Sequence, residues 1–168
     1  MADVVWAPWR MTYILAEKPT GCIFCERLCE QCDAKNLILW RGRMAFVMMN
    51  LYPYNNGHLM VVPHAHVASL TALEPIQRAE LGELTMRCEQ VLRHAMRPDG
   101  FNIGLNLGSA AAAGIAEHLH VHIVPRWEGD TNYMTVVGET RVIPQHIDQT
   151  YAMLLPYFQA LQQGSPPS

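Results

Sequence analysis

The sequence has few charges, no long apolar run and no recognisable export signal. Only 16% of its 168 residues are charged and the formal net charge is −3, so we expect no bulk attraction to nucleic acid or to an anionic membrane. Every apolar run is shorter than the roughly 18 residues that a membrane-spanning helix needs. Residues 1–10 lack the charged start and apolar segment of a secretory signal, so we expect a cytoplasmic protein. Any anionic substrate must therefore be recognised by a local site.

The cysteines do not have the distribution of a disulfide framework. Four of the five lie between positions 22 and 32, at Cys22, Cys25, Cys29 and Cys32. Without an export signal, such a cluster predicts a metal or redox site. The fifth, Cys88, falls within a helical pattern and is predicted to be a small core residue.

Half of the residues are apolar, and their periodicity predicts an α+β domain. Five strands are expected, two within residues 36–49 on either side of Gly42, and the others over residues 58–62, 101–107 and 118–124. Helices are expected over residues 74–97 and 145–162, and Pro156 should bend the second helix or divide it in two. We predict one domain over residues 1–163 around an antiparallel sheet, with an N-terminal arm and cysteine-rich segment at 1–35 and a flexible tail at 164–168.

A run of three histidines is the strongest chemical signal. His118, His120 and His122 alternate with aliphatic residues, and the run is followed closely by Pro125. On a strand, alternate side chains point to opposite faces, so the three imidazoles share one face while the aliphatic residues enter the core. Three imidazoles on a half-buried face each need a partner, which favours a functional site over a merely polar strand face.

Neighbouring imidazoles suit metal binding, nucleophilic catalysis or stabilisation of an anion such as phosphate. Side chains at i and i+4 of a strand are about 13 Å apart at about 3.3 Å per residue. His118 and His122 therefore cannot easily share one ion at a ligand distance of about 2 Å. We expect the three histidines to divide their roles.

Two motifs in this order resemble the histidine triad (HIT) family. One is Gly57–Pro63, a glycine-histidine pair followed by a strand pattern, and the other is the His-Leu-His-Val-His-Ile-Val run at 118–124. Further segments are similar to the diadenosine tetraphosphate phosphorylase-like branch: Trp6–Arg10, Gly21–Cys25, Asn50–Asn55, Gly100–Gly108, Pro125–Trp127, Gly129–Asn132 and Val142–Gln145. The resemblance covers roughly residues 6–155. It implies an α+β HIT fold and a homodimer whose sheets join edge to edge.

The resemblance also implies roles for three histidines. The middle residue of the run, His120, attacks the α-phosphorus of a nucleotide and forms a covalent nucleotidyl-histidine, which water or phosphate then resolves. His122 contacts the phosphate and helps the leaving group, and His58 approaches the same phosphate from the adjacent strand. Imidazole is largely unprotonated near neutral pH, which suits a nucleophile.

Other binding residues follow from the same resemblance. Asn50 matches the position that meets the ribose hydroxyls, and Asn106 with Gly108 matches the phosphate-contacting loop. For Gly108, a plain flexible turn is the alternative interpretation. Gly114 is a departure, because hydrolase members carry a glutamine there, four residues before the first histidine. This departure favours transfer to phosphate over hydrolysis.

A structural zinc site is implied by family members that carry the C-x₂-C pair. Its ligands here are Cys22, Cys25, His66 and His118, and four protein ligands close the site. The alternatives are a site without metal and a Cys₄ site that includes Cys29 and Cys32. His64 is an alternative to His66.

The family resemblance therefore predicts an enzyme that splits diadenosine tetraphosphate with inorganic phosphate to give ATP and ADP. A dinucleoside polyphosphate hydrolase or nucleoside phosphoramidase, with water as the acceptor, is the alternative within enzymes. A nucleotide-binding signalling module with slow turnover is the alternative from another class.

Overall fold

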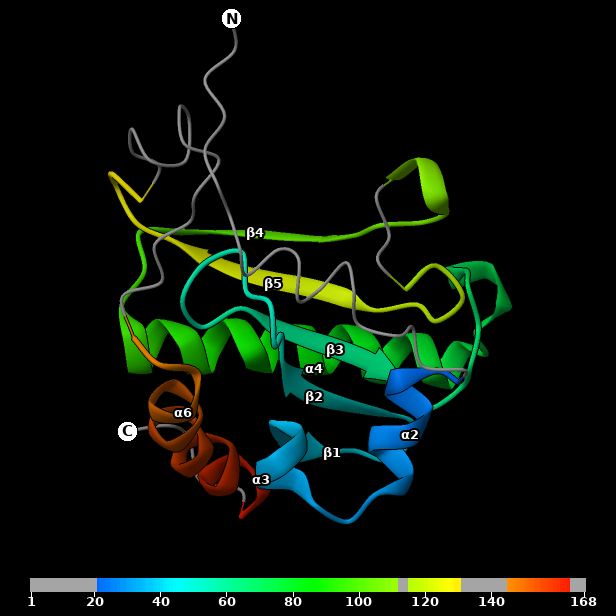
Figure 1. Cartoon of the computed structure of the whole chain (residues 1–168), viewed down its shortest axis with the longest axis horizontal. Coiled ribbons are helices and arrows are strands. Elements are labelled where there is room, and N and C mark those ends of the chain that lie inside the picture. The colour runs from blue at the N-terminus through cyan, green and yellow to red at the C-terminus, as the bar shows by residue number, and fades with distance from the viewer. Residues whose placement is uncertain (1–20, 112–114, 131–144, 164–168) are drawn as a thin grey trace, which may run out of the picture.

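The computed structural model describes residues 21–111, 115–130 and 145–163 (Figure 1). Within these ranges the chain forms one five-stranded antiparallel sheet with the order β1-β2-β3-β5-β4. The strands are β1 (Ile38–Arg41), β2 (Ala45–Met49), β3 (Leu59–Pro63), β4 (Gly100–Leu105) and β5 (Val121–Arg126). The helices are α2 (Ile23–Cys29), α3 (Asp33–Asn36), α4 (Pro75–Met96) and α6 (Ile147–Gln162), with 3₁₀ turns at Leu70–Ala72 and Ser109–Ala111. The predicted α+β class, the five strands and the two long helices are confirmed.

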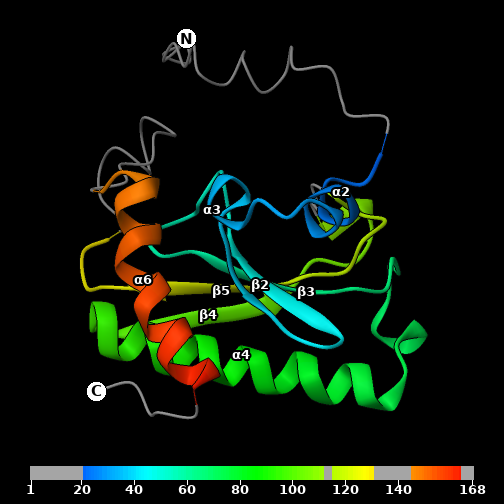
Figure 2. The ribbon, with the colours of Figure 1, turned by 90° about the horizontal axis from the view of Figure 1, so that it is seen from below.

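The long helix α4 lies along one face of the sheet, and α2 lies over the other (Figure 2). The first turn of α4 contains Pro75 and has a capping box. In this box the side chains of Glu74 and Gln77 each accept a hydrogen bond from the backbone of the other residue. Its apolar stripe is buried against the sheet, as the spacing predicts, and includes Leu81, Leu84, Cys88, Val91 and Leu92. Arg97, in the left-handed conformation, ends the helix.

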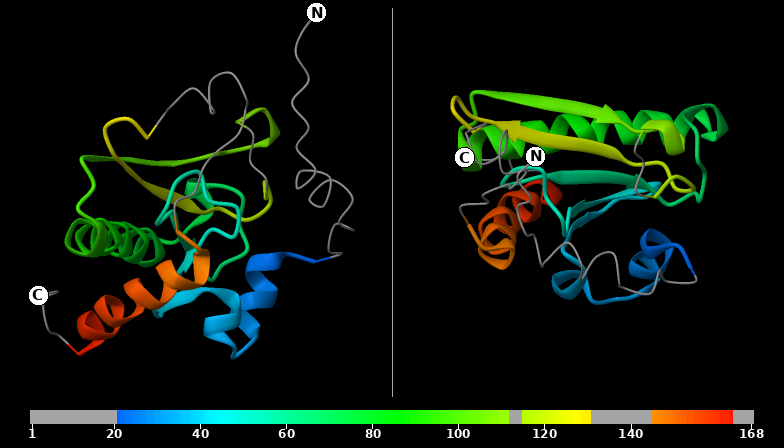
Figure 3. Two further views of the ribbon diagram at one scale, coloured as in Figure 1. Left: turned by 60° about the vertical axis from the view of Figure 1, so that its left-hand side comes forward. Right: turned by 45° about the horizontal axis from the view of Figure 1, so that its top comes forward.

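Helix α6 packs beside α4 on the same face (Figure 3). It is a single helix through Pro156, so the prediction that this proline divides it in two is wrong. Proline removes the hydrogen bond to the carbonyl of Ala152, four residues earlier. Both residues are exposed, so water can satisfy that carbonyl and the helix continues.

The sheet separates two clusters of buried side chains, one on each face, and the histidine run lies between them. Leu119, Val121 and Ile123 belong to the cluster under α4, which confirms the predicted alternation. Strand β5 begins only at Val121, later than expected. The N–H of Leu119 donates to the carbonyl of Val67 and the carbonyl of His118 accepts from a histidine ring, so neither group is free to join the sheet.

Pro125 lies inside β5 and does not end it, contrary to expectation. The carbonyl of the next residue, Arg126, accepts from Asp99 on the β4 side, so Pro125 faces the opposite side of the strand. The pairing with β3 has already ended at Ile123 there, and the missing N–H of proline costs no sheet hydrogen bond.

The cysteine-rich segment forms two short helices, α2 and α3, which the sequence did not predict. The ring of Phe24 on α2 packs on the sheet among Ile38, Phe46, Met48, Met60 and Val62. Residues 1–20 of the predicted arm and the predicted tail at 164–168 lie outside the described residues, so the domain boundaries stay a prediction. In the part of the chain that is described, none of the helices has the length and apolarity needed to cross a membrane.

Candidate active site and metal centre

His58 and His122 are joined across neighbouring strands. His58 immediately precedes β3, and His122 on β5 pairs with Met60, two residues further along β3. Such diagonal neighbours are within reach of long or aromatic side chains. The two rings meet with His58 Nε2 2.9 Å from His122 Nδ1, and both side chains are buried. The structure thus brings together two of the three predicted catalytic histidines through a direct hydrogen bond.

The hydrogen bonds around His58 determine which ring nitrogens carry protons. The backbone N–H of Tyr54 donates to His58 Nδ1 at 3.1 Å, so this nitrogen accepts and the proton of the neutral ring is on Nε2. His58 Nε2–H then donates to His122 Nδ1, which leaves the proton of His122 on its own Nε2. His122 therefore has an N–H donor to offer to a ligand. The amide of Asn50 lies 3.4 Å from the same His58 Nδ1, which places this predicted ribose-binding residue beside the histidines.

His120 has the opposite arrangement. Its Nδ1–H donates to the backbone carbonyl of His118 at 2.9 Å, so the lone pair is on Nε2. Its ring meets that of His122 edge to face, with the centroids 4.6 Å apart. A nitrogen lone pair and an N–H donor are thus carried by adjacent rings, which is what nucleophilic attack on a phosphate ester requires.

Burial keeps these two rings neutral. Burial lowers the pKa of His120, and the hydrogen bond to the His118 carbonyl opposes part of that change. Burial, together with the neighbouring His120, lowers the pKa of His122 to about 4. Both rings are therefore unprotonated at neutral pH, and the predicted nucleophile needs no general base to deprotonate it.

The predicted phosphate loop lies next to the histidines. Asn106 directly follows β4, whose last residue Leu105 pairs with Val121, the residue after His120. Gly108 has a φ of +78°, and an added Cβ would meet no atom within 4 Å. Glycine is thus required by the backbone conformation and not by close packing. Gly114 lies outside the described residues.

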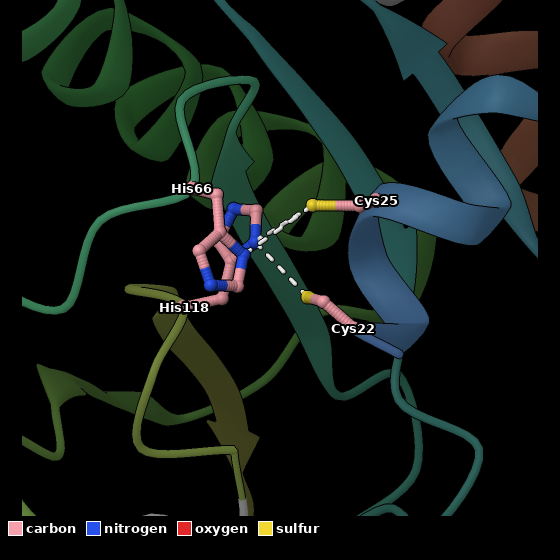
Figure 4. A group of neighbouring side chains, drawn as sticks. All are labelled: Cys22, Cys25, His66 and His118. Atoms are coloured by element: carbon pink, nitrogen blue, oxygen red, sulfur yellow. Dashed lines mark hydrogen bonds between the residues drawn. The ribbon is translucent and has the colours of Figure 1, made fainter. Parts of the chain in front are cut away.

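A second cluster lies on the other side of the histidine run. The ligand atoms of Cys22, Cys25, His66 and His118 all lie within 4.8 Å of one another (Figure 4). Sγ of Cys22 and Cys25 lie 3.2 Å and 3.6 Å from His118 Nδ1, and Cys25 Sγ lies 3.4 Å from His66 Nδ1. A tetrahedral zinc ion with bonds of about 2.3 Å to sulfur and 2.0–2.1 Å to nitrogen separates these atoms by about 3.5 Å. The donor set and its spacing therefore fit a closed zinc site.

The ring of His118 is oriented for this site. Its Nε2–H donates to the backbone carbonyl of Pro63 at 2.8 Å, which leaves the Nδ1 lone pair facing the thiols. Metal-ligating histidines are commonly oriented by such a carbonyl. The pKa of Cys25 is raised by burial and then by the neighbouring Cys22 thiol, so a cation is needed before both thiols ionise together.

The competing metal arrangements are not assembled. Cys29 and Cys32 are exposed, and among the described residues the metal-binding cluster does not include them. His64 packs on the Phe46 ring instead, with the centroids 6.1 Å apart. The four residues predicted as zinc ligands are those that lie together.

Comparison with known proteins identifies the family of this chain. The family model described as HIT domain matches residues 33–129. AP-4-A phosphorylase of Mycobacterium tuberculosis (strain ATCC 25618 / H37Rv) is 43% identical over 160 residues, covering 89% of this chain and 81% of that protein. The chain belongs to the HIT family. An asymmetrical bis(5'-nucleosyl)-tetraphosphatase of Schizosaccharomyces pombe is 30% identical over 93 residues, covering 55% of this HIT protein and 50% of the relative.

Among solved structures, the HIT protein is similar to a Zn-bound histidine triad family protein from Mycobacterium smegmatis. The TM-score is 0.68 and the identity 25%, over 86% of this chain and 98% of that chain. A histidine triad nucleotide-binding protein from Sulfolobus tokodaii has the same fold, with a TM-score of 0.66, 24% identity and coverage of 84% and 94%.

Two contributors to this HIT site were not predicted from the sequence. The ring of Phe24 contacts both His118 and His120, with centroids 5.4 Å and 5.0 Å away, and thereby connects the candidate metal-binding cluster to the predicted nucleophile. The Tyr54 backbone N–H fixes the His58 ring. For Phe24 the sequence holds a weak signal, because the C-x₂-C motif places this residue beside the cysteines. No side-chain pattern reveals a backbone donor.

Proposed function

We propose that this HIT protein is a nucleotidyltransferase that splits diadenosine tetraphosphate with inorganic phosphate into ATP and ADP. The observation that carries the proposal is the pair of neutral, adjacent rings of His120 and His122. Among the described residues, neither the Nε2 lone pair of His120 nor the Nε2–H of His122 has a hydrogen-bond partner. The 43% identity to a protein named AP-4-A phosphorylase supports the choice of substrate.

In the first step, Nε2 of His120 attacks the α-phosphorus of one adenosine. The bond from phosphorus to the bridging oxygen breaks and ATP leaves, while the AMP group becomes bonded to the ring. The ring gains positive charge as the new bond forms, and the carbonyl of His118 stabilises the proton on Nδ1. His122 Nε2–H donates to a phosphate oxygen and stabilises the charge that develops there.

In the second step, inorganic phosphate attacks the same phosphorus. The phosphorus–nitrogen bond breaks, its electron pair returns to His120 Nε2, and ADP is released. Asn50 is assigned to the ribose hydroxyls, and Asn106 and Gly108, with Gly114, are assigned to the phosphate loop. His58 acts through its hydrogen bond to His122.

The zinc ion has a structural role in this proposal. Cys22, Cys25, His66 and His118 would hold it, and its charge would favour the ionised thiolates. Because all four positions are filled by protein ligands, the site leaves none for a substrate. The ion fastens α2 to the segment that carries His120.

The proposal includes a homodimer and the single domain over residues 1–163. Strand β4 lies at an edge of the described sheet, and Ile103 on it is 44% exposed. An unpaired strand edge suits pairing with a second copy of the sheet. Light scattering on the purified protein tests the expected mass of a dimer, and a monomer would contradict it. A cytoplasmic location stays an expectation.

Product analysis with diadenosine tetraphosphate, with and without inorganic phosphate, tests the proposal. ATP and ADP appearing only with phosphate are the expected products. ATP and AMP in both conditions would make the protein a hydrolase, the second candidate, which the similarity to the Schizosaccharomyces pombe tetraphosphatase favours. Tight nucleotide binding without turnover would contradict both and favour a binding module.

A further inference from the structure

The loop before β3 is fastened to β5 by the side chain of Asn55. Its Nδ2 donates two hydrogen bonds, one to the backbone carbonyl of Pro125 at 3.1 Å and one to Asp130 Oδ2 at 2.8 Å. Its Oδ1 accepts from the backbone N–H of Asn56 at 3.0 Å. Both hydrogens of the amide and its oxygen are therefore used, and the amide has one orientation.

Asp130 determines that orientation. Its carboxylate accepts from Nε and Nη2 of Arg126 at 2.6 Å and 2.7 Å, and from the backbone N–H of Trp127 at 3.1 Å. The side chain of Asp130 is only 11% exposed. If the Asn55 amide were reversed, its oxygen would face this carboxylate and the Pro125 carbonyl, and both contacts would be repulsive. The charged pair thus holds the Asn55 donor toward β5.

Together with the chain, these hydrogen bonds form a closed ring of contacts that includes His58 and His122. The residue before Asn55 is Tyr54, whose N–H fixes His58, and His58 in turn donates to His122. His122 and Pro125 lie on the same strand, three residues apart. The position of the Tyr54 N–H relative to His122 is thus determined by covalent chain and hydrogen bonds around the whole ring. Removing the Asn55 side chain breaks the described side-chain link from this loop to β5.

We propose that Asn55 is a positioning residue that keeps His58 as an Nε2–H donor to His122. Among the described residues, the Asn55 side chain makes no hydrogen bond to His58, His120 or His122, and it acts through the Tyr54 N–H. This assignment rests on the proposed function only for its effect on turnover. The state of the His58 ring is a property of the protein without substrate.

The neighbouring Asn56 has a different task. Its amide bonds to Gln145 and accepts from the Thr150 hydroxyl, so it connects the same loop to α6. These contacts do not reach β5. They stabilise the fold near the loop but do not close the ring through the histidines.

The test is ¹⁵N NMR of histidine-labelled, zinc-loaded full chain without substrate, in the wild type and in Asn55→Ala. We expect His58 to be protonated at Nε2 alone in the wild type, and to become a mixture of both neutral tautomers in Asn55→Ala. Asn102→Ala is the matched control, because Asn102 accepts from Arg126 Nη1 at 2.6 Å and, among the described residues, makes no hydrogen bond to the loop. The control should resemble the wild type. An unchanged His58 in Asn55→Ala, or a mixture already in the wild type, would overturn the proposal.

Asp130→Asn is the second variant, for the case that Asn55→Ala fails to fold. It removes the charge that orients the amide without changing the size of the side chain, and a smaller change of the His58 tautomer in the same direction is expected. No change there would overturn the proposal.

Turnover of diadenosine tetraphosphate gives a second readout. Asn55→Ala should lower kcat by roughly 10- to 100-fold with KM much less affected, because a small misplacement of reacting groups costs rate. In a His58→Asn background it should cause little further loss. An equal loss in that background would show a general structural role and overturn the proposal. If the wild type does not turn over this substrate, the proposed function fails while the NMR comparison still decides the role of Asn55.

Discussion

Two histidines at positions 118 and 120 present opposite nitrogens to opposite sides of the same segment. His118 gives Nε2–H to the carbonyl of Pro63 and leaves Nδ1 for the thiols of the metal centre. His120 gives Nδ1–H to the carbonyl of His118 and carries its lone pair on Nε2. The two rings have the same chemistry and both are buried, so a backbone carbonyl determines which nitrogen of each ring carries the proton.

The two regions are also connected. The His118 carbonyl that fixes His120 belongs to a residue whose side chain lies in the metal centre, and Phe24 contacts both rings. Leu119 lies between His118 and His120 in the chain, and its N–H donates to the carbonyl of Val67 at 2.7 Å. Val67 is the residue after His66. The cluster of Cys22, Cys25, His66 and His118 is therefore connected to the ring of His120 through the backbone and Phe24.

The largest expected effect separates the two histidines directly. His120→Asn should lower kcat/KM by roughly 10³-fold or more, because an amide nitrogen is no nucleophile, while zinc content and nucleotide binding persist. His118→Asn should lose zinc and stability first, with a smaller loss of rate. Kinetics, metal analysis and nucleotide binding on both variants measure this. Equal rate losses with zinc retained in both variants would contradict the division of roles.

Removal of the metal has the next largest effect. A site occupied at about 1,000 times its Kd contributes about 4 kcal/mol, and 1 kcal/mol moves the Tm of a chain of this size by about 2–4 °C. Chelation, or Cys22→Ser, should thus lower the Tm by on the order of 10 °C. Calorimetry before chelation and after re-addition of zinc tests it. A Tm unaffected by chelation, in protein shown to have lost its metal, would contradict a stabilising site.

Lowering the pH should reduce the free energy of unfolding through protonation of His122. Its pKa is about 4 in the folded protein and about 6.5 when unfolded, so between these values the unfolded chain binds more protons. The contribution to stability is complete above the unfolded value and is lost as the pH falls. On the order of 2 kcal/mol should disappear between pH 6.5 and pH 5. Urea unfolding at both pH values should show a smaller difference in His122→Asn, and an identical difference would contradict the assignment.

The smallest expected effect defines the boundary of the metal centre. Cys29 and Cys32 are exposed and outside the ligand cluster, so a double substitution of both by serine should keep zinc at one ion per chain. Stability should change by no more than about 0.5 kcal/mol, as for other surface substitutions. Metal analysis beside Cys22→Ser gives the contrast. Zinc lost from the double variant would favour the Cys₄ arrangement.

Much of this arrangement could be predicted from the sequence because it follows from periodicity. The spacing of Leu81, Leu84 and Cys88 predicts the buried face of α4, and the alternation around His120 predicts which side chains enter the core. The four metal-centre residues were predicted from a family pattern, not from geometry. Their ligand atoms meet only because the tertiary fold brings α2, the segment after β3 and the histidine run together.

The remainder depends on backbone positions that residue types do not encode. The helices α2 and α3 form in a segment whose cysteines obscure any apolar period, and Pro125 continues a strand because its neighbour β3 has ended. The carbonyls of Pro63 and His118 are available to accept from the rings only because of where the chain runs. Local sequence patterns predict the position of neither carbonyl.

The most direct test of the division of roles is the protonation of each ring nitrogen in zinc-loaded protein at neutral pH. In ¹⁵N spectra of histidine-labelled protein, His118 should show Nε2–H with Nδ1 bound to metal, and His120 should show Nδ1–H with an unprotonated Nε2. Opposite patterns at these two positions are the predicted result. The same tautomer at both positions, or a protonated Nε2 on His120, would contradict the account.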